Sequence, residues 1–338
     1  MRYGYKASAE QFESRRLLDF SLAAERLGFD TIAVSDHFQP WRHNGGHAPG
    51  ALTWLGALGH ATHGAMVGTS VLTPTMRYHP SIVAQAFATL ARVTDGPVFL
   101  GIGTGEAMNE TPATGAPWPG GKERRLRLAE SIELIRRLWS EERVDFEGEY
   151  YKTVRATIYE RPEEPIPIYV AASGPLAAKL VGRVADGFIC TSGKPMELYQ
   201  GLLDAIAEGA GKAGRDPGDI ARMIEIKVSY DTDLERAKTA CHWWGALALS
   251  GAEKTGIDDP LELERLADAD PSRSTSRFIV STDPDEVVER IAPYVELGFT
   301  ELLFHGPGDD QGRFLELFAR DVLPRLRDRF GSSEVTPG

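Results

Sequence analysis

The stretch Glu25–His37 reads ERLGFDTIAVSDH and contains one repeated unit of this chain. A helical pattern ends before Gly28, which is able to take a left-handed cap, and the β-branched run Thr31–Ser35 follows at once. Val295–Phe299, with the sequence VELGF, repeats this arrangement before another strand-like run. The pattern therefore predicts helices that turn through a glycine directly into a sheet.

Strand-like runs of this kind recur along the whole chain, with amphipathic helical patterns between them. They are apolar without strict alternation, which indicates strands that are buried on both faces. Eight βα units in one chain predict an α/β fold, a closed (β/α)8 TIM barrel. The eight runs are Arg2–Lys6, Thr31–Ser35, Ala65–Leu72, Val98–Gly103, Ile166–Ala172, Gly187–Thr191, Ile224–Ser229 and Thr300–Phe304.

The length of 338 residues exceeds what a minimal barrel of about 250 residues needs, so roughly 90 remain for loop insertions. We expect a single domain over residues 1–338 because no linker, low-complexity segment or charge block divides the chain. The longest candidate insertions are roughly residues 38–50, 108–122, 145–165 and 231–277.

The charge and apolar pattern exclude several classes of partner. With 37 basic and 49 acidic residues, the net charge of -12 attracts neither nucleic acid nor an anionic membrane surface. No apolar run approaches the roughly 18 residues of a spanning helix, and the first residues have no signal-peptide pattern, so we expect a soluble cytoplasmic protein. Cys190 and Cys241 lack zinc-finger spacing and the eight histidines form no HExxH motif, so we expect no metal.

One glycine-rich motif resembles a dinucleotide fingerprint. In Gly101–Glu106, GIGTGE, the third glycine of GxGxxG is replaced by Glu106, and the motif follows the fourth strand rather than the first. These departures argue against NAD bound in the Rossmann manner. The glycines still allow a phosphate or ring of a ligand to lie close to the backbone.

Polar residues that follow the last apolar position of a barrel strand point into the active-site mouth. His37 and Trp41, Glu106, and Thr191 and Lys194 follow three different strands. Each alone has a structural explanation, since a histidine is often a structural hydrogen bonder and a glutamate at a helix start is often a cap. Their joint placement favours a catalytic site in which an imidazole and a carboxyl group form a base and acid pair.

Three basic residues could recognise an anion. Lys194 follows the sixth strand, and Lys254 and Arg277 bracket the long insertion before the last βα unit. If they converge, they suit a dianionic phosphate, with each charge-assisted contact worth about 1.5 to 3 kcal/mol. The residues alone favour solvated surface charge for Lys254 and Arg277.

Longer motifs extend these observations over nearly the whole chain. They are GYKASAEQF at 4–12, VSDHFQPWRH at 34–43, GTSVLTPT at 68–75, GTGE at 103–106, GFICTSGK at 187–194 and FHGPG at 304–308. Together they resemble the F420-dependent glucose-6-phosphate dehydrogenases of the bacterial luciferase-like superfamily. The resemblance implies a deazaflavin, coenzyme F420, held across the barrel mouth, and a homodimer.

The resemblance also assigns binding residues. It implies a cis peptide bond between Ser70 and Val71 that faces the coenzyme. The implied coenzyme contacts are Asp36, Thr73, Thr104, Gly105, Asn109, Ser173, Gly174, Leu176 and Ala177. The implied contacts of a small-molecule sugar phosphate are Thr191, Lys194, Lys254 and Arg277. For Lys254 and Arg277, this replaces the prediction of solvated surface charge.

The implied reaction moves a hydride from C1 of glucose 6-phosphate, or of a related hexose 6-phosphate, to C5 of F420, and yields 6-phosphogluconolactone and reduced F420. His37 would take the proton of the anomeric hydroxyl, and Glu106 would supply a proton to the coenzyme. Trp41 would exclude water, and Glu10 would orient His37 or the sugar.

Two positions depart from the family pattern: Thr255 stands where a histidine is usual, and Ser173 where a glycine is usual. Both leave the preferred hexose phosphate open, with mannose 6-phosphate and fructose 6-phosphate as candidates. Two other functions remain as alternatives, an FMN-dependent luciferase-like monooxygenase and a non-catalytic deazaflavin-binding protein. The three basic residues argue against the first, and retention of His37 and Glu106 argues against the second.

Overall fold

Eight parallel strands close into a barrel in the computed structural model, which describes residues 1–254 and 256–332. Neighbours in the barrel follow the order β1, β2, β3, β4, β7, β8, β9, β11, and β11 pairs with β1. The fold is therefore the predicted (β/α)8 barrel. The strands are β1 (Arg2–Ala7), β2 (Thr31–Val34), β3 (Met66–Thr69), β4 (Val98–Ile102), β7 (Ile168–Ala171), β8 (Gly187–Thr191), β9 (Ala221–Tyr230) and β11 (Glu301–His305).

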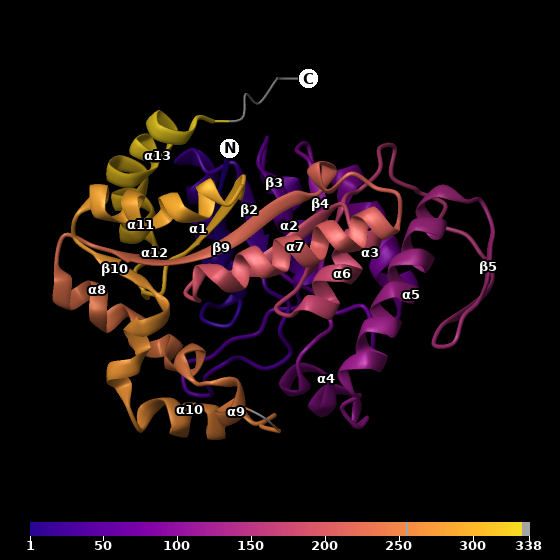
Figure 1. The fold of residues 1–338 in the computed structure, drawn as a ribbon, viewed down its shortest axis with the longest axis horizontal. Coiled ribbons are helices and arrows are strands. Elements are labelled where there is room, and N and C mark those ends of the chain that lie inside the picture. The colour runs from indigo at the N-terminus through magenta and orange to yellow at the C-terminus, as the bar shows by residue number, and fades with distance from the viewer. Residues whose placement is uncertain (255, 333–338) are drawn as a thin grey trace.

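Helices surround the barrel, and Figure 1 shows α6, α7 and α11 packed along the outside of the strands. The helices that follow barrel strands are α1 (Ser14–Arg26), α2 (Ala51–Ala61), α3 (Pro80–Val93), α5 (Gly121–Ser140), α6 (Pro175–Val184), α7 (Met196–Lys212), α11 (Pro284–Glu296), α12 (Gln311–Leu317) and α13 (Leu323–Phe330). None of the described helices is both long enough and apolar enough to cross a membrane.

An apolar layer fills the barrel interior. It consists of buried side chains from seven of the strands, one from each: Ala33, Met66, Phe99, Tyr169, Ile189, Met223 and Leu303. The barrel is therefore a packed core at this level and not a pore. A larger apolar cluster joins the outer faces of the strands to the helices.

The predicted insertions contain short elements rather than irregular loops alone. Segment 108–122 includes most of α4 (Ala107–Thr114), and the region 145–165 overlaps the hairpin of β5 (Val144–Glu147) and β6 (Lys152–Ala156), which projects beyond α5 in Figure 1. Segment 231–277 includes α8 (Leu234–Ala240), α9 (Gly251–Lys254) and α10 (Pro260–Asp268). The short strand β10 (Ile279–Ser281) then pairs with β9.

The local predictions are mostly confirmed. Gly28 and Gly298 have φ of +93° and +91°, so both take the left-handed conformation that ends a helix before a strand. The expectation of strands without alternation is wrong for β9. Its residues Ile224–Ser229, IEIKVS, alternate strictly, because the even-numbered side chains pack toward the helices while Glu225 and Lys227 face the barrel interior.

Candidate active site

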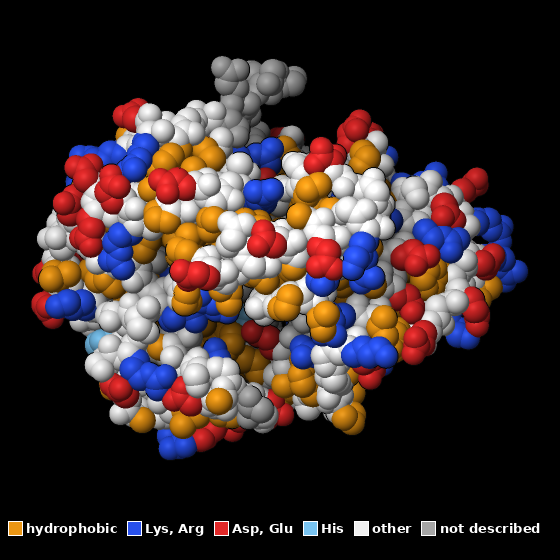
Figure 2. Space-filling view, in the orientation of Figure 1, with side chains coloured by type: hydrophobic (Ala, Val, Ile, Leu, Met, Phe, Trp, Pro, Cys, Tyr) orange, Lys and Arg blue, Asp and Glu red, His pale blue; other side chains and the backbone are white. Residues whose placement is uncertain are grey.

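A cavity of about 470 Å³ lies at the carboxyl ends of the barrel strands. Figure 2 shows the surface hollowed between α9 and α10 on one side and α4 on the other, with hydrophobic and basic side chains around the hollow. The predicted site residues that line the cavity are Glu10, Asp36, His37, Trp41, Ser70, Val71, Thr73, Thr104, Gly105, Glu106, Asn109, Ser173, Thr191, Lys194, Lys254 and Arg277.

Three predicted residues lie beside this cavity rather than in its lining. Gly174, Leu176 and Ala177 form the start of α6, directly after Ser173. The peptide bond between Ser70 and Val71 is cis, as the resemblance implied. Thr255 lies outside the described residues. A separate hollow of about 830 Å³, lined by α8 and the segments 229–233 and 307–310, contains none of the predicted site residues.

His37 lies at the centre of a hydrogen-bond network. Its Nε2 is 3.2 Å from Oε1 of the buried Glu10, and the hydroxyl of Ser35 donates to Oε2 of Glu10 at 2.5 Å. Burial acts to raise the pKa of Glu10, but the neighbouring His37 and Lys6 and the Ser35 hydrogen bond outweigh it and lower this pKa. Glu10 is therefore an ionised carboxylate that orients the imidazole.

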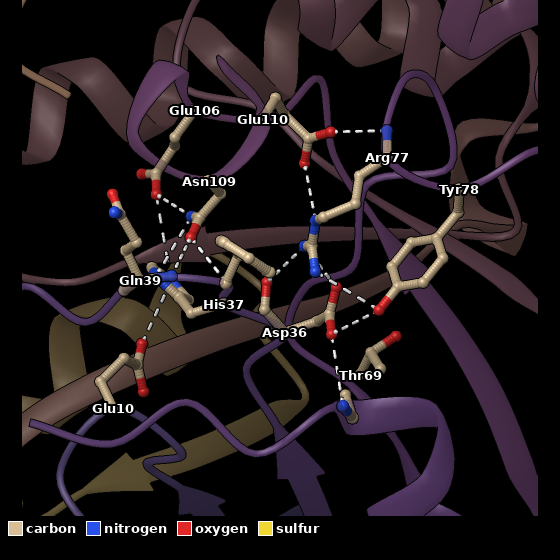
Figure 3. Close-up of polar contacts among 12 residues, drawn as sticks. Glu10, Asp36, His37, Gln39, Thr69, Arg77, Tyr78, Glu106, Asn109 and Glu110 are labelled. Atoms are coloured by element: carbon tan, nitrogen blue, oxygen red, sulfur yellow. Dashed lines mark hydrogen bonds and ion pairs between the residues drawn. The ribbon is translucent and has the colours of Figure 1, made fainter. Parts of the chain in front are cut away.

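The other side of the imidazole faces Asn109 (Figure 3). Nδ1 of His37 lies 3.1 Å from the backbone carbonyl of Gln39 and 3.2 Å from Nδ2 of Asn109. Oδ1 of Asn109 accepts from the backbone N–H groups of Phe38 and Gln39, at 2.9 and 3.2 Å. Asn109 thus holds the segment that carries His37, while the Gln39 carbonyl accepts a hydrogen bond whenever Nδ1 carries a proton.

Glu106 and Trp41 complete this end of the cavity. Oε2 of Glu106 is 3.9 Å from Nε2 of His37 and accepts from Nδ2 of Asn109 at 3.3 Å. The ring of Trp41 lies 5.9 Å from that of His37, centroid to centroid, and Nζ of Lys254 is 5.4 Å from the Trp41 ring centroid. Trp41 therefore connects the histidine to the basic end of the cavity.

Lys194, Lys254 and Arg277 form that basic end. Among the described residues none of the three forms an ion pair with a carboxylate, and Arg277 donates to the backbone carbonyls of Leu247 and Ser192 at 3.2 and 3.0 Å. Burial and then the positive charge of Arg277 lower the pKa of Lys194. Burial chiefly lowers the pKa of Lys254, with Arg277 and Lys194 adding to it against Glu106. Three neighbouring cations without carboxylate partners among the described residues favour a bound anion.

Asp36 lines the cavity wall, but its carboxylate already accepts hydrogen bonds from Arg77, Tyr78 and Ala51 (Figure 3). Oδ2 accepts from Arg77 at 2.7 Å, and Oδ1 accepts from the hydroxyl of Tyr78 and the N–H of Ala51, each at 3.3 Å. Arg77 also pairs with Glu110, whose side chain, like that of Asp36, is fully buried. Burial and the charge of Asp36 raise the pKa of Tyr78 to about 12.

The floor of the cavity contains residues that the sequence analysis did not single out. They are Lys6, Glu225, Lys227, Trp244 and His305. The strict alternation of IEIKVS in β9 was the signal for Glu225 and Lys227, because a buried parallel strand with regular polar positions must face a polar interior. Burial acts to raise the pKa of Glu225, but Lys227, His305 and Lys6 lower it well below its ordinary value.

Comparison with known proteins gives consistent results. The model of the family described as luciferase-like monooxygenase matches residues 1–301. A protein of Beutenbergia cavernae named F420-dependent glucose-6-phosphate dehydrogenase is 60% identical over 331 residues, 97% of this chain and 98% of its own. One of the same name from Segniliparus rotundus is 57% identical over 329 residues, again 97% and 98%.

Solved structures agree in fold. An F420-dependent secondary alcohol dehydrogenase in complex with an F420-acetone adduct superposes with a TM-score of 0.90 at 33% identity, covering 97% of this chain and 99% of its own. The coenzyme F420-dependent tetrahydromethanopterin reductase of Methanopyrus kandleri has a TM-score of 0.80 at 23% identity, with 96% and 99% covered. The second likeness concerns the fold alone.

Replacing Arg77 with methionine is expected to destabilise the fold by about 3 to 5 kcal/mol, because it leaves the buried carboxylates of Asp36 and Glu110 without their cation. Urea denaturation at pH 7 measures this loss. The deficit should shrink toward pH 5, since unpaired buried carboxylates take up protons. Arg92→Met, which removes an exposed pair with Glu163, should cost less than about 1 kcal/mol. Equal losses in the two variants would contradict a structural role for the Arg77 network.

Proposed function

Since this chain belongs to the luciferase-like monooxygenase family, and relatives 55 to 60% identical to it are named F420-dependent glucose-6-phosphate dehydrogenases, we propose that it oxidises glucose 6-phosphate with coenzyme F420 as hydride acceptor. The observation that carries this function is the pairing of two features in one cavity. Lys194, Lys254 and Arg277, which have no carboxylate partner among the described residues, supply a phosphate site, and the Glu10–His37 pair supplies a base.

The cavity fits a planar coenzyme. Its volume of about 470 Å³ is in the range of small-molecule sites. Phe38 and Leu176 lie next to lining residues in the chain, and their side chains are 52 and 58% exposed. The coenzyme ring would pack against these large apolar side chains. A Cβ at Gly174 would meet nothing within 4 Å, which leaves open space at the start of α6.

Coenzyme F420, when bound, supplies the hydride acceptor. The residues that would hold it are Ser70 and Val71 together with Asp36, Thr73, Thr104, Gly105, Asn109, Ser173, Gly174, Leu176 and Ala177. The carboxylate of Asp36 is already engaged by Arg77, so Asp36 supports the wall and offers only its remaining lone pairs.

His37 is placed to act on the sugar. Its neutral imidazole would take the proton of the anomeric hydroxyl at Nε2 while the hydride passes from C1 to the bound coenzyme, which leaves the lactone. The imidazolium is stabilised on both sides, by the Glu10 carboxylate at Nε2 and by the Gln39 carbonyl at Nδ1. Glu106 lies at the mouth, 3.9 Å from Nε2 of His37, where it would deliver a proton to the coenzyme, and Trp41 would exclude water from the reacting carbon.

Different observations count against the two other functions. An FMN-dependent monooxygenase would itself use cations for the FMN phosphate, so the relatives 55 to 60% identical that are named F420-dependent dehydrogenases are what count against it. A non-catalytic deazaflavin-binding protein would not need a histidine base held by Glu10, so the contact of His37 with Glu10 argues against that function. From the family resemblance we also infer a homodimer located in the cytoplasm, which sedimentation and cell fractionation test.

The purified protein, mixed with oxidised F420 and glucose 6-phosphate, should bleach the visible absorbance of the deazaflavin. The rate should be at least about 100-fold lower with unphosphorylated glucose, because the three cations have no anion to bind. FMN in place of F420 should give no turnover. Tight F420 binding without bleaching by any hexose 6-phosphate would favour the binding-protein alternative.

Lys254→Ala and Arg277→Ala should each raise KM for glucose 6-phosphate about 10- to 100-fold, since each removes one charge-assisted contact to the phosphate. Steady-state kinetics with F420 in excess measure this change. Lys152→Ala, on the exposed β6 of the hairpin, is the matched control and should leave KM unchanged. An equal loss with unphosphorylated glucose would contradict phosphate binding.

His37→Ala should lower kcat about 100- to 10,000-fold and leave the Kd of F420 within about threefold, because it removes the base and not a coenzyme contact. Fluorescence titration gives the Kd and absorbance gives kcat. His63→Ala is the control, since the His63 side chain is 86% exposed. A variant with normal kcat but weak F420 binding would assign His37 to the coenzyme instead.

A further inference from the structure

The cavity floor contains three charged or polar side chains for which the proton chemistry above has no use. Glu225 and Lys227 lie on β9 and His305 on the neighbouring β11, where His305 is the register partner of Lys227. They are 7, 3 and 2% exposed, and all three line the cavity. Burying this many polar groups costs stability unless they find partners, so their presence at a cavity points to a ligand.

The contacts within this group leave hydrogen-bonding capacity unused. Nζ of Lys227 is 3.1 Å from Oε1 of Glu225, and the same oxygen is 3.4 Å from Nδ1 of His305. Nε2 of His305 forms no hydrogen bond to any residue in the described part of the chain. An ammonium has three donors and an imidazole two polar atoms, so a bound hydroxylated ligand can be both donor and acceptor here.

The group lies between the two ends of the cavity. At the basic end, the hydroxyl oxygen of Ser192 accepts from the backbone N–H of Lys227 at 2.9 Å, and the carbonyl of Ser192 accepts from Arg277 at 3.0 Å. At the other end, Lys6 donates to the carbonyl of Ser70 at 2.8 Å and lowers the pKa of Glu10, and it also lowers the pKa of Glu225. The floor therefore connects the phosphate end to the His37 end.

We propose that Glu225, Lys227 and His305 are specificity-determining residues that hydrogen-bond the sugar hydroxyls between the phosphate and the anomeric carbon. This inference rests on the proposed function. A hexose 6-phosphate with its phosphate at Lys194, Lys254 and Arg277 and its C1 at His37 must place its other hydroxyls over this floor. Glu225 accepts from a hydroxyl, Lys227 donates to one, and His305 does either.

Lys227 differs from the phosphate-binding cations in its partner. Its charge is compensated by Glu225 at 3.1 Å, whereas Lys194, Lys254 and Arg277 have no carboxylate in ion-pair contact among the described residues. A neutral pair is suited to hydroxyls, and an uncompensated cluster to a dianion. This contrast separates the proposal from the rival in which Lys227 is a fourth phosphate ligand.

The experiment compares substrates across variants. Glu225→Gln, His305→Gln and Lys227→Met are assayed for kcat/KM with glucose 6-phosphate, mannose 6-phosphate, 2-deoxyglucose 6-phosphate and galactose 6-phosphate, with F420 in excess. Each variant should lose at least about tenfold on glucose 6-phosphate, and its preference over at least one analogue should shrink by a similar factor. For a substrate that lacks the contacted hydroxyl, the substitution should leave kcat/KM nearly unchanged. This dependence of the loss on the substrate identifies which hydroxyl the residue contacts.

Inhibition by inorganic phosphate separates the two ends of the cavity. Lys254→Ala should weaken this inhibition at least about tenfold, and Glu225→Gln and Lys227→Met should change it less than about threefold. If Lys227→Met weakens it as much as Lys254→Ala does, Lys227 is a phosphate ligand and its assignment here is overturned. If a variant loses the same factor on all four sugars, the floor is only structural and the proposal fails.

Controls keep the test independent of folding. Glu301→Gln changes another buried glutamate of the barrel, one bonded to the Tyr169 hydroxyl and outside the cavity lining, and should leave discrimination among the sugars unchanged. Lys227→Met leaves a buried carboxylate unpaired, so the double variant Lys227→Met/Glu225→Gln, which removes both charges, carries the test if the single variant unfolds. F420 affinity and Tm confirm that each variant is folded.

The wild-type protein separates this inference from the function on which it rests. If it reduces F420 with no hexose 6-phosphate, the proposed function fails and the inference with it. If it is active with glucose 6-phosphate but Glu225→Gln and His305→Gln leave the discrimination among the four sugars as it was, only the inference fails.

Discussion

Closure of the barrel is the constraint on which the rest of the structure depends. The eight barrel strands pair without a break from β1 around to β11 and back to β1, so alternate side chains of each barrel strand must face a closed interior. In β9, Met223 lies in the apolar layer, and Glu225 and Lys227 reach the cavity above it. One strand thereby supplies both the packed base and the polar floor of the site.

Compensation of charge decides what this polar interior can do. Arg77 pairs with the buried carboxylates of Asp36 and Glu110, and Glu225 pairs with Lys227, so these charges are compensated within the protein. Lys194, Lys254 and Arg277 are left uncompensated among the described residues. A chain of net charge -12 repels anions at long range, yet these three make one small region attractive to a dianion.

The fold and one end of the site were predictable because the signals are local. All eight barrel strands appear where strand-like runs predict them, and His37 lies three residues after the end of β2. The sequence did not predict the polar floor, because a glutamate that faces the barrel interior has the same local sequence as an exposed one. Only the regular alternation of polar and apolar residues along β9 distinguishes the two. Nothing local indicated Arg77 as the partner of Asp36, 41 residues earlier in the chain. Lys254 and Arg277 lie in α9 and at the end of segment 271–277, so residue pattern alone favoured the surface for both.

By itself, the sequence determined where strands and helices form, which glycines end helices, and which polar residues stand at strand ends, because these depend on neighbours a few positions away. Resemblance added the identity of the coenzyme and the substrate. Only the tertiary structure brought Lys194, Lys254 and Arg277 into one cavity with His37, and left Glu225, Lys227 and His305 beneath them. The physical reason is that ion pairing and desolvation depend on distance in space, and residues more than 200 positions apart become neighbours only when the barrel closes.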